Sequence, residues 1–114
     1  MKRILLAICV IALSLLSYGQ GSNERAFTFA WLSDVHLNSF AYAEDDLRQS
    51  IEDINANPDV AFTILSGDVT EFGDTKEFYL LQDILKNFRK PYFLIPGNHD
   101  VNWSENGCTM FDKI

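Results

Sequence analysis

The stretch PYFLIPGNHD, residues 91–100, sets a polar GNHD block directly against an apolar run. Residues 92–95 are apolar and β-prone, and Pro91 is tolerated at the first position of a strand, so we expect a short strand over 92–95. The chain contains only two histidines, and His99 lies just beyond the end of this predicted strand. That position makes His99 a candidate functional residue.

Two further strands are expected upstream of this block. Residues 26–32 (AFTFAWL) and 60–65 (VAFTIL) are almost wholly apolar and rich in β-branched or aromatic residues. Such runs are typical of strands that are buried on both faces. Trp31, in the middle of the first run, is accordingly assigned to the core.

Two amphipathic helices separate the predicted strands. Residues 43–55 carry apolar side chains at helical spacing, namely Leu47, Ile51 and Ile54, and residues 75–88 carry a similar stripe. Asp74 or Thr75 is expected to cap the second helix. The acidic residues around its start (Glu71, Asp74 and Glu77) are expected to be solvated.

The order strand, helix, strand, helix, strand is that of two βαβ units. Because crossovers between parallel strands are right-handed, the three strands are expected to be parallel neighbours in one sheet of an α/β fold. Residues 101–114 show no strong period.

Each predicted strand is followed by a polar cluster. Asp34 and His36 follow the first strand, Asp68 follows the second, and the GNHD block follows the third. Successive clusters are separated by about one βα unit of ~30 residues. Because the carboxyl ends of parallel strands meet at one edge of the sheet, the three clusters are expected to converge there.

Carboxylate, imidazole and amide groups gathered at one edge favour a metal site. Packed carboxylates repel one another and are costly to desolvate, and a divalent cation relieves both costs. Mixed oxygen and nitrogen donors suit Mn, Fe, Zn or Ni. Gly67 and Gly97 are expected to let the chain turn sharply, so that the side chains that follow point into the site.

The motifs Asp-x-His (34–36), Gly-Asp (67–68) and Gly-Asn-His-Asp (97–100) resemble the first three sequence blocks of the calcineurin-like metallophosphoesterase superfamily. The resemblance implies hydrolysis of a phosphate mono- or diester, with a small-molecule phosphoester as substrate, at a site holding two divalent metal ions. It implies the following roles: Asp34 and His36 bind the first metal, Asp68 bridges both, Asn98 binds the second, His99 stabilises the transition state or protonates the leaving oxygen, and Asp100 orients His99.

The same resemblance implies a βαβαβ front half of the metallophosphoesterase α/β sandwich, spanning residues 27–114. The family supplies further ligands from a later histidine and a Gly-His-x-His block, and this sequence has no histidine after His99. We therefore expect the complete site to need ligands beyond this chain, and the chain alone to bind metal poorly. Position 71 holds Glu where purple acid phosphatases carry a metal-binding tyrosine. The string GDVTEFGDTKEF is more similar to the branch containing cyclic-nucleotide phosphodiesterases.

The N-terminal residues predict export. Met1, Lys2 and Arg3 precede an apolar run over 4–16 and a small, polar stretch, which is the plan of a signal peptide over 1–19. The apolar run is shorter than the ~20 residues of a spanning helix, so no stable membrane anchor is expected. Residues 20–26 are interpreted as a linker. Periplasmic or extracellular localisation follows, with Cys108 as the lone cysteine of the exported part.

The charge balance excludes one class of partner. Nine Lys and Arg stand against sixteen Asp and Glu, and no basic patch is visible in the sequence, so nucleic-acid binding is not expected. Two alternatives to an active hydrolase stay open. The first is a non-catalytic exported binding module, and the second is an inactive fragment that retains the first half of the fold.

Overall fold

The computed structural model describes residues 26–38, 42–101, 109 and 111–113. The predicted signal peptide, most of the predicted linker and Cys108 lie outside the described residues. The elements are β1 (Thr28–Ser33), α2 (Ala43–Ala56), β2 (Val60–Ser66), α3 (Thr75–Leu85), β3 (Tyr92–Ile95), α4 (Asn98–Val101) and the 3-10 turn η2 (Phe111–Lys113). Among these, no helix is long and apolar enough to cross a membrane.

The three strands form one parallel sheet in the order β1-β2-β3. This confirms the predicted pair of βαβ units. Helix α3 ends at Leu85, three residues before the predicted end, because the backbone amides of Asn87 and Phe88 bond back only three residues, to Ile84 and Leu85. Such tight bonds close the last turn of a helix. The short helix α4, which the sequence pattern did not predict, follows β3.

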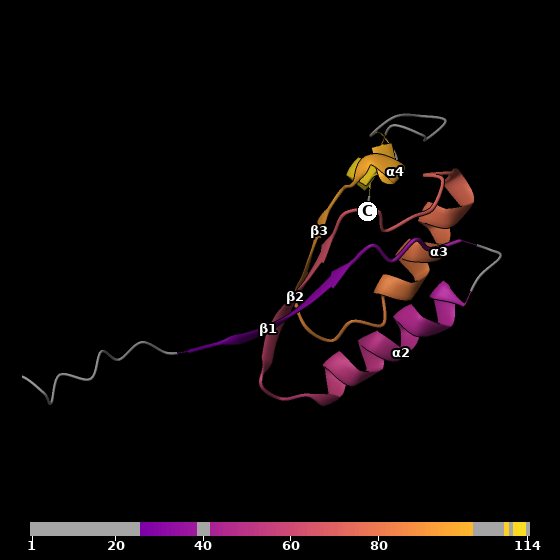
Figure 1. Cartoon of the computed structure of the whole chain (residues 1–114). Coiled ribbons are helices and arrows are strands. Elements are labelled where there is room, and N and C mark those ends of the chain that lie inside the picture. Colours follow the sequence, from indigo (N-terminus) through magenta and orange to yellow (C-terminus); the bar gives the residue numbers. More distant parts are fainter. Residues whose placement is uncertain (1–25, 39–41, 102–108, 110, 114) are drawn as a thin grey trace, which may run out of the picture.

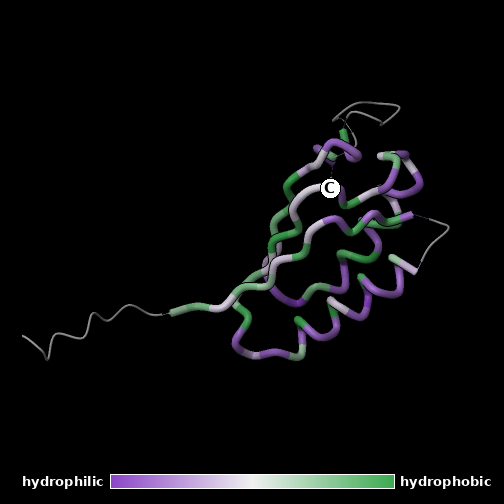
Figure 2. Tube along the Cα trace, in the orientation of Figure 1, coloured by the Kyte–Doolittle hydropathy of each residue, from purple (hydrophilic) through white to green (hydrophobic). Residues whose placement is uncertain are grey.

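The core lies between the sheet and the two long helices, which cover the same side of the sheet (Figure 1). Both crossovers move across the sheet in the same direction, and crossovers between parallel strands are almost always right-handed, so both helices are expected on the same face. Figure 2 shows the helices apolar toward the sheet and polar outward. The buried cluster is formed by Leu37, Leu47, Ile51, Leu65, Val69, Phe78, Leu81, Ile84 and Leu85.

None of the described residues covers the opposite face of the sheet. The prediction that the strands are buried on both faces is therefore wrong for this chain. Side chains alternate between the two faces of a strand. Trp31 is 68% exposed, and it is therefore not a core residue; Phe93 is 57% exposed. The rings of Phe29 and Phe62 stack with centroids 5.3 Å apart on this face. It is thus an apolar, largely aromatic surface.

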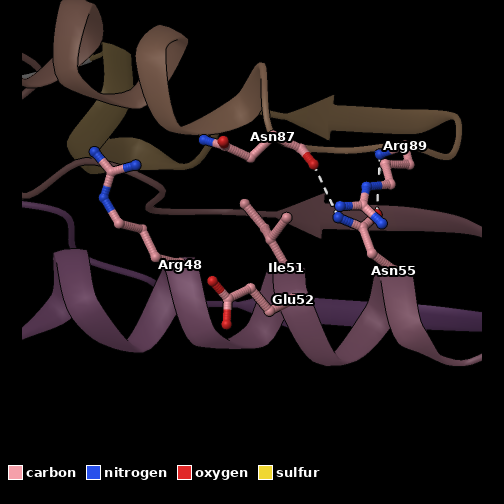
Figure 3. A pocket seen from close by; sticks show the side chains of 6 residues that line it. All are labelled: Arg48, Ile51, Glu52, Asn55, Asn87 and Arg89. Carbon is pink, nitrogen blue, oxygen red and sulfur yellow. Dashed lines mark hydrogen bonds between the residues drawn. The ribbon is translucent and has the colours of Figure 1, made fainter.

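A side-chain clamp joins the end of α2 to the loop between α3 and β3. The Asn55 amide donates to the carbonyl oxygen of Asn87 at 2.8 Å, and its oxygen accepts from the backbone N–H of Arg89 at 2.9 Å. Figure 3 shows both bonds at one side of a surface pocket that Arg48, Ile51 and Glu52 also line. The clamp fixes the end of the core far from the loops that follow the strands.

The start of α3 is more ordered than the sequence suggested. Asp74 is the N-cap, as predicted, and its side chain accepts from the backbone N–H of Glu77 at 2.8 Å. Glu77 is not solvated, because its side chain folds back to accept from the Phe72 N–H at 2.9 Å and the residue is only 3% exposed. Burial raises the pKa of Glu77 above its ordinary value, and the bond from Phe72 opposes this effect.

This burial makes the stability contribution of Glu77 pH-dependent. Between its ordinary pKa of 4.5 and the raised pKa of the folded state, the native protein binds a proton that the unfolded chain has released, so stability falls as pH rises through this window. In Glu77→Gln the amide oxygen still accepts from Phe72, but position 77 no longer titrates. We therefore expect the free energy of unfolding of the variant, minus that of wild type, to be larger at pH 7 than at pH 4. Urea unfolding at both pH values measures this. Exposed Glu52 on α2 supplies the control, since Glu52→Gln should show no such trend. A flat difference for Glu77→Gln would contradict the expectation.

Candidate metal centre

The loops that follow β1 and β2 stay hydrogen-bonded to each other beyond the end of the sheet. The backbone N–H of Asp34 donates to the Gly67 carbonyl at 3.2 Å, and that of His36 donates to the Asp68 carbonyl at 2.9 Å. Leu37 and Thr70 then form an isolated parallel bridge. This pairing holds the Asp-x-His and Gly-Asp motifs side by side.

Three of the predicted ligands have an unusual backbone. Asp34, His36 and Asp68 have φ angles of 54°, 49° and 46°, in the left-handed region that L-residues rarely adopt. Each such residue costs of the order of 1–2 kcal/mol, and strain of this kind gathers at functional sites. These left-handed residues follow the ends of β1 and β2, so they redirect the side chains there at the sheet edge.

The side chains of Asp34, His36 and Asp68 converge. Their ligand atoms lie within 4.8 Å of one another, although they come from two different strand ends. The hydroxyl of Ser33 contacts both the Asp34 carboxylate and the Ser66 carbonyl, at 2.9 Å from the latter, and so fixes Asp34 against β2. Two carboxylates this close repel each other unless a cation lies between them. Two carboxylates and an imidazole gathered within this distance form a mixed oxygen and nitrogen donor set that fits a divalent ion.

The GNHD block joins this group through its backbone. The N–H of His99 donates to Asp68 Oδ1 at 3.0 Å, which places α4 beside the Asp68 carboxylate. Asn98 is the first residue of α4 and is exposed. The three motifs therefore meet at one edge of the sheet, with Asn98 adjacent in sequence to the residue that contacts Asp68.

Asp100 is fully buried and binds backbone instead of the His99 ring. Its carboxylate accepts from the N–H groups of Val69, Thr70 and Gly97 at 3.2, 2.8 and 2.7 Å, and from the Thr70 hydroxyl at 2.7 Å. The expectation that Asp100 orients His99 directly is therefore corrected. Asp100 joins the loop after β2 to the loop after β3, and it positions His99 through the main chain.

Gly97 serves close packing. Its φ is not in the left-handed region, whereas Gly67 has φ 72°. A Cβ at position 97 would lie 2.8 Å from Asp68 Cγ and would overlap Asp68 Oδ1 and the Asp68 backbone nitrogen. The expected sharp turn thus applies to Gly67, while Gly97 lets the third strand approach Asp68.

The His99 ring is held by a backbone carbonyl. Its Nδ1 lies 2.6 Å from the carbonyl oxygen of Glu71, which can only accept, so Nδ1 carries the proton. This bond raises the pKa of His99 above its ordinary value; partial desolvation lowers it, and the carboxylates of Asp68, Glu71 and Asp100 raise it further. The ring of His36 packs edge-on against it, with centroids 4.9 Å apart.

Sequence reasoning missed Glu71, which was interpreted as solvated. Its Oε2 lies 2.9 Å from His36 Nδ1, and its ligand atom forms a second group with those of His36 and His99, all within 4.8 Å of one another. The only signal in the sequence was its place shortly after the Gly-Asp motif, where another branch of the superfamily carries a tyrosine.

Comparison with known proteins agrees with this geometry. A family model for calcineurin-like phosphoesterases matches residues 27–113. The chain is 31% identical over 77 residues to a probable glycerophosphodiester phosphodiesterase GpdQ of Arcobacter nitrofigilis, covering 60% of this chain and 28% of that protein. It is 32% identical over 91 residues to a probable cyclic nucleotide phosphodiesterase of Ruthia magnifica, covering 75% of this chain and 38% of that protein.

The chain therefore spans well under half the length of these two relatives. The resemblance drawn from the three motifs is confirmed, and the single parallel sheet with helices on one side agrees with the front half of the metallophosphoesterase fold. The chain belongs to the calcineurin-like phosphoesterase family.

Proposed function

We propose that this chain carries part of the active site of a metal-dependent phosphoesterase that hydrolyses a phosphate mono- or diester at a dinuclear site. The observation that carries this proposal is the convergence of Asp34, His36 and Asp68 within 4.8 Å, each on a strained left-handed backbone. The names of the relatives, a glycerophosphodiester and a cyclic nucleotide phosphodiesterase, favour a diester.

In this proposal, Asp34 and His36 would hold one ion, Asn98 would hold a second, and Asp68 would serve both, with further ligands from outside this chain. When bound, divalent ions supply positive charge for the phosphate oxygens and lower the pKa of a bound water. Mn, Fe, Zn and Ni all suit this donor set.

His99 is proposed to donate a proton to the leaving oxygen. Its Nδ1–H is bound to the Glu71 carbonyl, so the proton for the leaving oxygen would come from Nε2. In the metal-free chain the bond to the Glu71 carbonyl raises the pKa of His99, which is the direction that favours a general acid. Asp100 supports this geometry by fixing the backbone on both sides of the site.

A Mn²⁺ titration of the full chain tests the metal site. We expect weak binding that Asp68→Asn reduces at least tenfold, because the substitution removes the carboxylate shared by the two ions. Asp59→Asn, at an exposed position before β2, is the matched control and should bind as wild type does. Equal binding by wild type and Asp68→Asn would refute the site, and tight binding of two ions would refute the need for further ligands. Hydrolysis of bis-p-nitrophenyl phosphate, compared with the monoester, then reports the substrate class.

Export is proposed from the sequence alone, on the basis of the signal-peptide plan over 1–19. N-terminal sequencing of the mature protein should begin at Gln20, and retention of Met1 would contradict it. A non-catalytic binding module remains the second candidate, and metal binding without any phosphoester hydrolysis in the longest natural form of the protein would favour it.

A further inference from the structure

Glu71 faces both histidines of the site, but with different groups. Its carboxylate Oε2 lies 2.9 Å from His36 Nδ1, and its backbone carbonyl lies 2.6 Å from His99 Nδ1. The residue is held in place from two directions. Its N–H donates to the Leu37 carbonyl at 3.1 Å, and the N–H of Phe72, the next residue, donates to the buried Glu77 carboxylate.

The contact between Glu71 and His36 favours one position for the proton on the His36 ring. In a neutral imidazole one nitrogen donates and the other presents a lone pair. A lone pair on Nδ1 that faced a carboxylate oxygen at 2.9 Å would be repelled by it, whereas an N–H is attracted. The alignment of the two groups is not that of a hydrogen bond, so the attraction is mainly electrostatic.

The consequence for His36 lies at its other nitrogen. With the proton on Nδ1, the lone pair stays on Nε2, so Nε2 is the ring nitrogen that can bind a divalent ion. Carboxylates that hold one nitrogen of a ligating histidine commonly set its tautomer in this way. His99 takes the same tautomer, but its proton is held by the backbone of Glu71 and does not depend on that side chain.

We propose that Glu71 is a positioning residue whose carboxylate holds His36 in the Nδ1–H form and so presents Nε2 to a divalent ion. The metal part of this proposal rests on the proposed function. The tautomer part does not, because it concerns the metal-free chain.

The two histidines of the chain make the test direct. The full chain, labelled with ¹⁵N-histidine and free of metal, is studied by NMR at a pH above 8, where imidazoles are neutral. We expect both rings to be protonated on Nδ1. Glu71→Ala should shift His36 toward the Nε2–H form and leave His99 unchanged, because alanine keeps the backbone carbonyl. Glu71→Asp should restore part of the His36 population, and Glu52→Ala, at an exposed position on α2, is the control.

Metal affinity gives the second measurement. We expect Glu71→Ala to weaken Mn²⁺ binding about 10–100-fold, as for other carboxylates that orient a ligating histidine. The proposal is overturned if wild-type His36 is protonated mainly on Nε2, a result that requires no variant to fold. It is also overturned if Glu71→Ala leaves the His36 tautomer unchanged, or changes both rings alike. Equal Mn²⁺ binding by wild type and Asp68→Asn would refute the metal site alone, so the two failures are distinguishable.

Discussion

Replacing Asp100 by alanine is expected to destabilise the fold by about 3–5 kcal/mol. The substitution removes the acceptor for three backbone N–H groups and one hydroxyl in a fully buried position. Each buried donor left without a partner costs about 1–3 kcal/mol, and partial entry of water reduces the sum. The free energy of unfolding of a small domain is roughly 5–15 kcal/mol in total. A loss of this size should therefore leave the variant only marginally folded.

Urea unfolding at pH 7 measures this loss. Asp100→Asn is expected to fall between wild type and Asp100→Ala. It keeps one oxygen for Thr70 but places an NH₂ group against the donors of Val69 and Gly97, or the reverse. Asp45→Ala, at an exposed position in the first turn of α2, should cost less than about 1 kcal/mol. A loss for Asp100→Ala no larger than that of the control would show that water replaces the carboxylate without cost.

Most of the fold could be predicted from the sequence because its periods are unambiguous. The apolar spacing of Leu47, Ile51 and Ile54 matches a helix that buries one face, and those three residues are buried. The strand β3 was predicted with its observed bounds, since Pro91 and the GNHD block mark its two ends. The rule of right-handed crossovers then gave parallel neighbours.

What the sequence could not supply was the exposure of each strand face. An apolar strand such as residues 26–32 indicates burial on both faces, but only the helices that cover it decide whether that burial occurs within one chain. Trp31 points to the face that α2 and α3 leave open, and so it is exposed. Composition alone cannot distinguish a buried tryptophan from one on an uncovered sheet face.

The site, too, was predicted only in part. The convergence of Asp34, His36 and Asp68 followed from the topology of a parallel sheet, and the structure brings these three together. The hydrogen-bond partners of the acidic side chains around the site could not be predicted from this topology. Glu71 lies in the loop after β2 and Asp100 in the short helix α4. Only the path of the backbone decides that Glu71 lies against His36 while Asp100 is buried.

Replacing Gly97 by alanine is expected to cost about 3 kcal/mol and to displace Asp68. The added Cβ would lie 2.8 Å from Asp68 Cγ and would overlap the backbone nitrogen of Asp68, which cannot move without pulling β2 with it. Overpacking against side chains costs about 1–3 kcal/mol, and overlap with backbone falls at the upper end of that range. Urea unfolding measures the loss of stability, and Mn²⁺ titration should show weaker binding because the bridging carboxylate has moved.

Gly67→Ala is the matched control, since Gly67 lies in the same site but is constrained differently. Its φ of 72° favours glycine, yet a Cβ there would meet nothing within 4 Å. Alanine at that position should therefore cost only the left-handed backbone term of about 1–2 kcal/mol. From the sequence alone both glycines were assigned to sharp turns, which predicts similar losses. A larger loss at position 97 would show that the third strand end reaches Asp68 only because Gly97 lacks a side chain, whereas equal losses, or a larger loss at 67, would contradict this.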